Sequence, residues 1–582
     1  MSTMTYDVIV KGGRWFDGTG APSQLRDLGI RGGRVVAVSE EPLDETGCGR
    51  VVDAAGKWVL PGMLDIHTHY DVEVLEGPDL VESLRHGVTT IFIGSCSLST
   101  IHVDPVTAGD LFGRVEAIPR RFVIEALRKH QSWTNAQEYV DALESLPLGP
   151  NVAAFVGHSD IRSAVMGLDR ATRKDVRPSE TELRTMEAHL TEALDAGFIG
   201  MSAQELVFDK LDGTVARSRT LPSTYARGRE RRRLNKLLRK RKLALQGGPD
   251  IKNPLSIARM TAGSLPVRGG TLKTSLLSAA DLKANPYLVN IMEPIAKTVN
   301  ALGGDFRWQH LPVPFEVYAD GIDLVIFEEF GSGAAALHLA DQVERNTLMQ
   351  DEEYRRWFRK DYDAKFGMRV WHRDFFDAEI VECPDDSVIG KTFGQVGVER
   401  GLHPADAFLD MVVEHGTKVR WRTTISNHRP EVAEKLGRSP GVQIGFSDAG
   451  AHLRNMAFYN FGLRFLRRVK DAEAAGRPFM SVEHAVHRLT GELAEWYGVD
   501  AGHLREGDRA DLVVIDPQHL DASLDAYAEA PVEQYDRLPR MVNRNDAAVT
   551  AVLVNGEHVF GEGRPGEALG ARRTGQFLRA QV

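Results

Sequence analysis

The sequence contains little cysteine and no long apolar run, and both features narrow the class of protein. Its 582 residues include three cysteines, Cys48, Cys96 and Cys383, whose odd number and wide spacing exclude the disulfide framework of a small secreted domain. No uninterrupted apolar stretch approaches the roughly 18 residues that predict a membrane-spanning helix. The first residues lack the basic and then apolar segments of a secretory leader. We therefore expect a cytoplasmic protein that does not bind a membrane.

An excess of positive charge is also lacking. The chain has 71 Lys and Arg against 81 Asp and Glu, a formal net charge of -10, which argues against a nucleic-acid-binding protein. One local exception is residues 227–242, which include ten basic residues. Leu234, Leu237 and Leu238 give this run a short apolar seam, so it is interpreted either as a solvated outer helix or as a surface that binds an anion or a partner. The run contains no aromatic residue, so stacking on nucleic-acid bases is unsupported.

Both ends of the chain are rich in predicted β-strands. Residues 6–13 and 29–38 combine β-branched residues with Gly-Gly turns. Residues 509–517 and 549–556 have the same character, and the second of these segments ends in Asn555-Gly556, a hairpin-turn signal. Such segments at opposite ends predict one small β domain, built from residues 1–62 and 505–582 together.

Residues 63–504 change to apolar strands that alternate with amphipathic helices. Residues 180–196, for instance, place Leu183, Met186 and Leu190 on one helical face. Buried parallel strands with crossover helices explain this alternation, and the number of repeats favours a closed α/β barrel over an open sheet. The apolar runs are residues 89–94, 152–156, 198–201, 243–245, 272–277 and 442–446.

Two further segments complicate the count of barrel strands. Residues 306–308 and 419–422 together would raise it above eight, and the sequence does not choose between them. Residues 315–418 are charged and aromatic at once, and we interpret them as a mostly helical insert that covers the mouth of the barrel.

Two histidines stand where the β-rich start gives way to the α/β repeat. In His67-Thr68-His69, strand alternation directs both imidazoles to one face, where they can bind one metal ion. The pair follows the segment 60–66, which places it near the carboxyl end of the first barrel strand. Because barrel active sites lie at that end, the pair predicts a metal site.

A cysteine and an aspartate follow two other predicted barrel strands. Cys96 is either an inert buried thiol or, because adjacent strand ends lie close together, a thiolate that reaches the same metal. Asp448 follows residues 442–446, a late strand that would lie beside the first strand in a closed barrel. It is either a helix cap or a carboxylate that contacts the metal and accepts a proton from its bound water.

Several short motifs occur in the same order as in one family of enzymes. They are Leu60-Pro61-Gly62-Met63-Leu64-Asp65-Ile66-His67-Thr68-His69, Gly94-Ser95-Cys96, Val156-Gly157-His158-Ser159, Ser447-Asp448 and Gly507-Asp508-Arg509-Ala510-Asp511-Leu512-Val513-Val514. Together they resemble the amidohydrolase superfamily, and within it the N-acyl-D-amino-acid deacylase (D-aminoacylase) family. The resemblance covers nearly the whole chain. It implies an α/β fold in which a metal-dependent-hydrolase (β/α)8 barrel of the TIM type lies beside a small β-sandwich built from both termini.

The resemblance also implies roles for individual residues. His67, His69 and Cys96 fall on metal-ligand positions, with the cysteine in place of the carboxylated lysine of related hydrolases. Asp448 falls on the catalytic aspartate, which also contacts the metal. His158 falls on a histidine near the active site, and we take it as a substrate-binding residue.

The chain departs from the family at two strand ends. The family's remaining metal ligands are two histidines at the ends of the fifth and sixth strands, but residues 243–248 and 271–278 contain none. We therefore expect one zinc ion, with the second site lost. Lys273 as a carboxylated ligand is an alternative.

Two residues after Asp448 are candidates for substrate binding. Arg454 is either a bidentate partner of a substrate carboxylate or one half of a surface ion pair. His452 is a second ligand, a proton donor or a loop residue, and the sequence leaves all three roles open.

These residues predict a metal-dependent hydrolase of a carbon–nitrogen bond, in which zinc activates water and Asp448 passes the water proton to the leaving nitrogen. The resemblance implies N-acyl-D-amino acids as substrates. A cyclic amide, a carbamate or another N-acyl compound at the same site is the alternative. From another class, the alternative is a non-catalytic barrel that has lost its metal. The expected partner is a small molecule, and a homo-oligomer is compatible with the aromatic insert.

Overall fold

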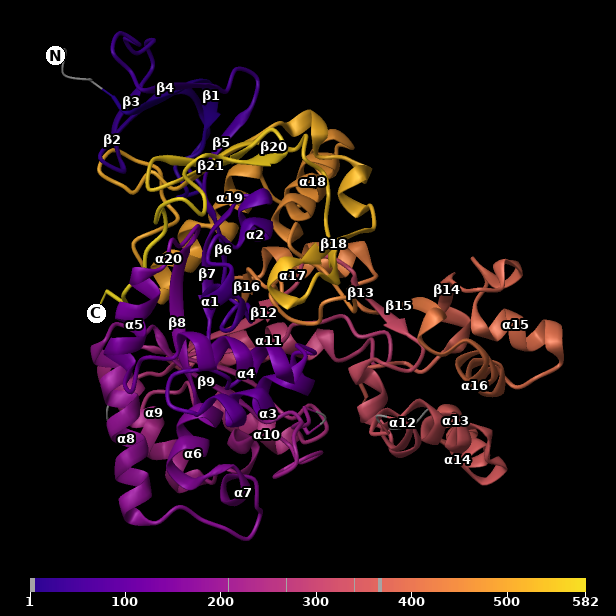
Figure 1. Ribbon diagram of the computed structural model, residues 1–582. Helices are drawn as coiled ribbons and strands as arrows, with labels where there is room; N and C mark the ends of the chain where they lie inside the picture. The colour runs from indigo at the N-terminus through magenta and orange to yellow at the C-terminus, as the bar shows by residue number, and fades with distance from the viewer. Residues whose placement is uncertain (1–5, 208, 268–269, 340, 365–368, 582) are drawn as a thin grey trace.

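An eight-stranded parallel sheet forms the centre of the computed structural model (Figure 1). The structure describes residues 6–207, 209–267, 270–339, 341–364 and 369–581. The strands of the sheet lie in chain order, and helices cross from the end of one strand to the start of the next. They are β6 (Met63–Asp65), β7 (Val88–Ile93), β8 (Asn151–Gly157), β9 (Gly200–Gln204), β10 (Ala244–Gly248), β11 (Lys273–Leu276), β12 (Asp305–His310) and β16 (Val442–Ile444).

The first and last of these strands meet just beyond their carboxyl ends. The Ile66 amide donates to the Gly445 carbonyl at 2.7 Å, and the His69 amide donates to the Ala449 carbonyl at 2.7 Å. These hydrogen bonds close the sheet into a barrel, so the predicted (β/α)8 fold is confirmed. Closure also brings the residues that follow β6 against the residues that follow β16.

The barrel strands are buried because helices cover their outer side. Every residue of β7 and β8 is buried, as their continuous apolar runs predict. Helix α8 (Glu180–Asp195) begins at a capping box between Ser179 and Glu182, and it buries Leu183, Met186 and Leu190. Among the described residues, none of the helices combines the length and apolar character that crossing a lipid bilayer requires.

The basic run forms helix α9 (Gly228–Arg241), which lies against α8 on the outside of the barrel. Arg229 and Arg233 contact Glu180 and Glu187 of α8, and Arg241 contacts Asp195 at the C-terminal end of the same helix. Leu234 and Leu238 are buried. The cations are therefore matched by a neighbouring acidic helix, which supports the interpretation as a solvated outer helix.

The two ends of the chain share one nine-stranded sheet. Strand β5 (Trp58–Pro61) pairs antiparallel with β17 (Leu512–Ile515), and this pairing joins the N-terminal strands to the C-terminal ones. The other strands are β1 (Val8–Trp15), β2 (Gln24–Arg31), β3 (Arg34–Ser39), β4 (Arg50–Asp53), β20 (Val549–Val554), β21 (Glu557–Gly561) and β22 (Arg564–Pro565). The small terminal domain is thus one continuous sheet, to which both ends contribute.

The insert lies between β12 and β16 and projects from the barrel as a separate lobe (Figure 1). It has an aromatic core of its own, which includes Phe327, Trp371 and Phe408. Residues 419–422 belong to this lobe and not to the barrel. Of the two segments that the sequence left open, residues 306–308 therefore form the barrel strand. The lobe contains β13 (Phe315–Asp320), β14 (Glu379–Glu382), β15 (Arg420–Ser426), α12 (Gly331–Leu337), α13 (Gln342–Gln350), α14 (Glu352–Asp363), α15 (Phe393–Arg400) and α16 (Pro404–His415).

Candidate metal centre

Three of the residues singled out from the sequence converge inside the barrel. His67 and His69 follow β6, and their ring centroids lie 5.2 Å apart. Cys96 follows β7, and its Sγ lies 3.3 Å from His67 Nε2. One ligand atom from each of the three residues lies within 4.8 Å of the others, and all three side chains are buried. Two imidazoles and a thiol at this spacing match the donor set that zinc prefers.

The carboxylate of Asp448 lies beside the same atoms. Its Oδ1 is 3.1 Å from His69 Nε2 and 3.7 Å from His67 Nε2. Its Oδ2 is 3.4 Å from His452 Nε2. One oxygen therefore faces the two histidines, while the other faces His452.

The backbone at this centre adopts a conformation that L-residues rarely take. Cys96, Asp448 and His452 have φ values of 51°, 61° and 58°, in the left-handed region. Such residues persist where the surrounding structure imposes the conformation, and they gather at functional sites. Here they turn the chain sharply after β7 and β16, which directs the Cys96 and Asp448 side chains towards the histidines.

Burial determines the protonation of the cluster. Desolvation lowers the pKa of His67 to about 4, so its imidazole is neutral at pH 7, as metal binding requires. Burial alone would raise the pKa of Asp448, but the contacts with His452 and His69 outweigh it and hold that pKa well below its usual range. Burial and the surrounding carboxylates, Glu116 first among them, raise the pKa of the Cys96 thiol well above its usual value. Cys96 must therefore release a proton when it binds a metal.

Two residues that were not identified from the sequence lie against the histidine rings. His67 Nδ1 donates to Gln309 Oε1 at 2.8 Å, and the amide nitrogen of Gln309 donates to Ser275 at 3.0 Å, so Gln309 is fixed in turn. Glu116, which follows α3 (Pro105–Val115), places Oε1 3.4 Å from His69 Nδ1. His67 is thus oriented by a hydrogen bond at Nδ1, whereas Glu116 approaches His69 Nδ1 without forming a hydrogen bond. Nε2 of each histidine faces Asp448, which leaves it for a metal. An acid at a helix end is too common in sequences to have predicted this role for Glu116.

Replacing Glu116 by glutamine is expected to lower zinc affinity by about 10–100-fold, because such supporting carboxylates orient and polarise the ligand imidazole. Zinc titration against a competing chelator measures the effect. Glu125→Gln, at an exposed position of α4 (Arg120–His130), is the matched control and should bind zinc like the parent protein. Equal affinity in Glu116→Gln and Glu125→Gln would remove Glu116 from the centre.

The predicted substrate-binding residues have different surroundings. His452 lines the same cavity as His67 and Asp448. Arg454 pairs with Asp320 at 2.8 Å and with Glu529 at 2.9 Å. His158 opens α6 (His158–Met166) and contacts Glu230 of α9 at 2.8 Å. Neither Arg454 nor His158 is among the described residues that line the cavity. Their roles in substrate binding therefore stay predictions, without a contact to support them.

The ends of β10 and β11 contribute neither an imidazole nor a carboxylate. Gln246 of β10 donates to the Ile66 carbonyl at 3.0 Å and so links the fifth strand to the first. Leu277, just after β11, lines the cavity. Lys273 stands at the opposite end of β11, where its Nζ donates to the Trp496 carbonyl at 2.7 Å. The alternative in which Lys273 is a metal ligand is therefore wrong.

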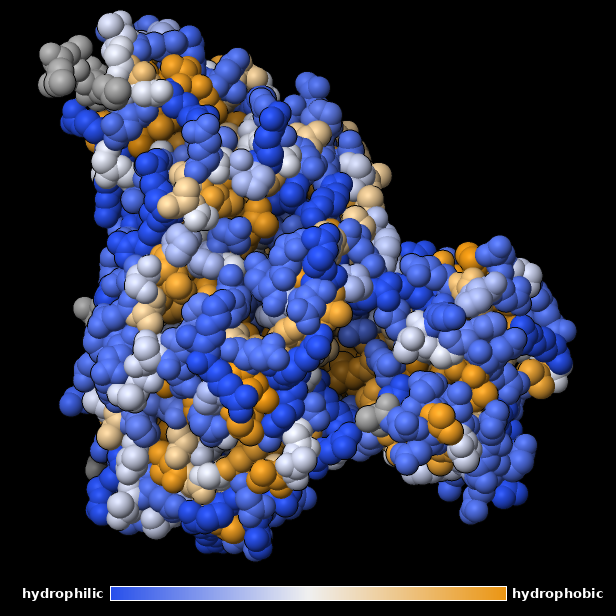
Figure 2. All heavy atoms as spheres, in the orientation of Figure 1, coloured by the Kyte–Doolittle hydropathy of each residue, from blue (hydrophilic) through white to orange (hydrophobic). Residues whose placement is uncertain are grey.

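A cavity of about 290 Å³ connects the metal centre with the space between barrel and insert. Its walls come from the strand ends of the barrel, from α11 (Val289–Ala301) and from the start of the lobe. Figure 2 shows apolar side chains gathered in the hollow between the barrel and the lobe. The insert therefore shapes the access to the metal centre.

Comparison with known proteins shows what the chain is similar to. No family model matches it. An uncharacterized protein of Mycobacterium tuberculosis is 56% identical over 99% of this chain and 96% of its own length. The D-aminoacylase of Alcaligenes xylosoxydans is 34% identical over 34% of this chain and 37% of its own length. Among solved structures, the N-acyl-D-glutamate deacylase of Bordetella bronchiseptica, complexed with zinc and a phosphonate inhibitor, covers 99% of this chain and 100% of its own at a TM-score of 0.62 and 22% identity.

Proposed function

We propose that this chain hydrolyses an amide at a single zinc ion. It belongs to the D-aminoacylase-like family of the amidohydrolase superfamily, whose members act on carbon–nitrogen bonds other than peptide bonds. The observation that supports this proposal is the convergence of His67, His69 and Cys96 beside Asp448 at the carboxyl ends of the barrel strands. Zinc suits the donor set, since it binds imidazole, thiolate and carboxylate in four-coordinate sites. When bound, zinc supplies Lewis acidity, which polarises an amide carbonyl and lowers the pKa of a coordinated water towards about 7.

Asp448 is the proposed general base and acid. Its contacts with His452 and His69 keep the carboxylate ionised, so it can accept a proton from the attacking water. The same carboxyl then delivers that proton to the leaving nitrogen, which departs as an amine. His452 holds Oδ2 of Asp448 and so directs Oδ1 towards the histidine pair.

The sequence relatives with known activity suggest where to look for a substrate. Their names specify D-aminoacylase, N-acyl-D-glutamate deacylase and N-acyl-D-aspartate deacylase. N-acyl-D-amino acids are therefore the first compounds to test, and a cyclic amide, a carbamate or another N-acyl compound is the alternative at the same site.

The proposal is tested by assaying amine release from a panel of amides with protein that holds one equivalent of zinc. We expect turnover that a chelator abolishes and that added zinc restores, because the cavity contains no other electrophile among its described lining residues. Stoichiometric appearance of carboxylic acid and amine identifies the bond that is cleaved. If zinc binds but no amide, cyclic amide or carbamate is hydrolysed, the non-catalytic alternative replaces this proposal.

A further inference from the structure

The cavity beyond the metal centre is lined almost entirely by hydrocarbon. Helix α11 contributes Ile291, Met292 and Ile295, and β12 contributes Trp308. The start of the lobe contributes Leu324 and Ile326. The apolar part is continuous with the metal centre, because one cavity includes both. A ligand whose reacting group lies at His67 and His69 therefore extends into an apolar space.

Besides its histidines and Cys96, the ionisable side chains that line this cavity are acids. Asp448, Glu116 and Asp209 are grouped at the end where the metal ligands lie, and Glu329 lines the cavity from the lobe. No lysine or arginine is found among the lining residues that the structure describes. Apart from the proposed zinc ion, an anionic group on a ligand would thus meet acidic side chains without a lysine or arginine among the described lining residues to balance it.

Two basic residues that adjoin lining residues in the sequence are already engaged elsewhere. Arg454 is held between Asp320 and Glu529. Lys252 donates to the backbone carbonyl of Glu329 at 3.1 Å. Releasing either cation for a substrate would break these contacts, which costs free energy.

These two properties select for one kind of substrate. Burying a carboxylate without a counter-ion is strongly unfavourable. Burying hydrocarbon is favourable and is equivalent to about a fourfold gain in affinity for each methylene group. The cavity therefore favours a neutral molecule with a long apolar part and disfavours one with a free carboxylate.

We propose that the substrate of this site is an uncharged amide that carries an extended apolar group, such as a medium-chain or long-chain acyl group on a neutral amine. This inference rests on the proposed function for the cleavage itself. It concerns the rest of the molecule, since it replaces the charged carboxylate of an N-acyl-amino acid with a neutral substituent.

Matched pairs of substrates test the proposal with the intact zinc protein. N-acyl-D-alanine and N-acyl-D-alaninol differ in a carboxylate against a neutral alcohol, and each is made with acyl chains of increasing length from acetyl to lauroyl. We expect kcat/KM to rise about fourfold per methylene until the chain fills the cavity. At each length we expect the alcohol to be preferred by at least about tenfold. A preference for the carboxylate, or no dependence on chain length, would overturn the proposal.

Binding to zinc-free protein separates this inference from the proposed function. Calorimetric titration with lauramide, acetamide and laurate needs no catalysis. Tight binding of lauramide alone, without hydrolysis of any amide by the zinc protein, would refute the proposed function and support the inference. Hydrolysis of short N-acetyl-D-amino acids, without detectable binding of lauramide, would support the proposed function and refute the inference.

A charge introduced into the wall provides a second test. Leu277 is half-buried at the end of β11 and lines the cavity, so Leu277→Lys adds a cation there, and Leu277→Met adds an unbranched apolar chain of similar length. The preference for alaninol over alanine should fall by at least about tenfold in Leu277→Lys and stay unchanged in Leu277→Met. An unchanged preference in a folded Leu277→Lys protein would show that charge does not govern selection.

Discussion

Asp448→Asn is expected to lower kcat by at least about a thousandfold while the protein stays folded, because asparagine cannot accept the proton of the attacking water. The substitution keeps the size of the side chain, and the left-handed backbone at Asp448 suits asparagine as well as aspartate. The loss should therefore come from the chemistry and not from rearrangement. Steady-state kinetics, together with the thermal unfolding midpoint, measure the two effects separately.

The control for this prediction is Asp209→Asn. Asp209 lines the same cavity, but its carboxylate accepts a hydrogen bond at 2.7 Å from the side-chain amide of Gln204 and does not contact the histidine pair. We expect its kcat to change by less than about tenfold. Because Asp448 also faces the metal ligands, zinc content is measured for both variants. Turnover by zinc-loaded Asp448→Asn within about tenfold of the parent enzyme would eliminate Asp448 as the base.

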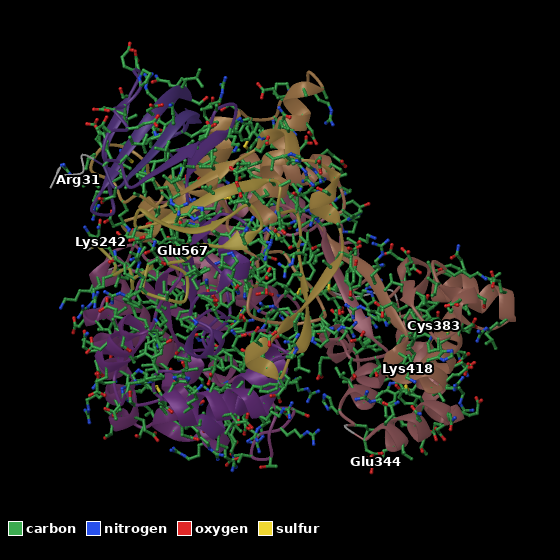
Figure 3. The ribbon with its side chains drawn as sticks, turned by 45° about the horizontal axis from the view of Figure 1, so that its top comes forward. Arg31, Lys242, Glu344, Cys383, Lys418 and Glu567 are labelled. Atoms are coloured by element: carbon green, nitrogen blue, oxygen red, sulfur yellow. The ribbon has the colours of Figure 1, made fainter. Side chains whose placement is uncertain are left out.

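Cys96→Ala is expected to weaken zinc binding by more than the roughly 10–100-fold that loss of a supporting residue causes, since Cys96 is a proposed direct ligand. Cys383→Ala and Cys48→Ala are the matched controls. Figure 3 shows Cys383 in the lobe of the insert, and Cys48 lies before β4 with its thiol donating to the Arg50 carbonyl at 3.0 Å. Both control variants should bind one equivalent of zinc like the parent protein.

Cys96→Ala is also expected to change how zinc affinity depends on pH. The raised pKa of Cys96 means that the thiol is protonated at pH 7 before zinc binds, so binding releases its proton. Apparent affinity should therefore rise with pH by up to about tenfold per unit, and this component should vanish in Cys96→Ala. Competition titrations between pH 6 and 8 provide the measurement. A parent protein and a Cys96→Ala variant with the same slope would exclude the thiol from the ligand set.

Much of the architecture follows from local sequence patterns. The alternation of apolar runs with amphipathic helices predicts a parallel barrel, because strand and helix periodicity are properties of short segments. His67, His69, Cys96 and Asp448 could be grouped in advance for the same reason. Each follows a predicted strand, and the carboxyl ends of barrel strands meet at one face.

Contacts between distant segments could not be predicted in this way. Gln309 orients His67 across a separation of 242 residues, and nothing near either residue signals the pairing. The engagement of Arg454 by Asp320 and Glu529 likewise depends on where the lobe and the C-terminal segment pack. An arginine after a strand end has the same local appearance whether it is free to bind a substrate or already paired.

The scarcity of cysteine and of long apolar runs was enough to exclude a disulfide scaffold and a membrane-spanning helix, and strand-end positions were enough to nominate the metal ligands. Tertiary structure alone decided which nominated residues meet. It placed Lys273 at the far end of its strand, assigned residues 419–422 to the lobe and added Glu116 to the centre. The physical reason is that periodicity encodes the face on which a side chain lies, whereas its partners depend on how the barrel closes and where the insert packs.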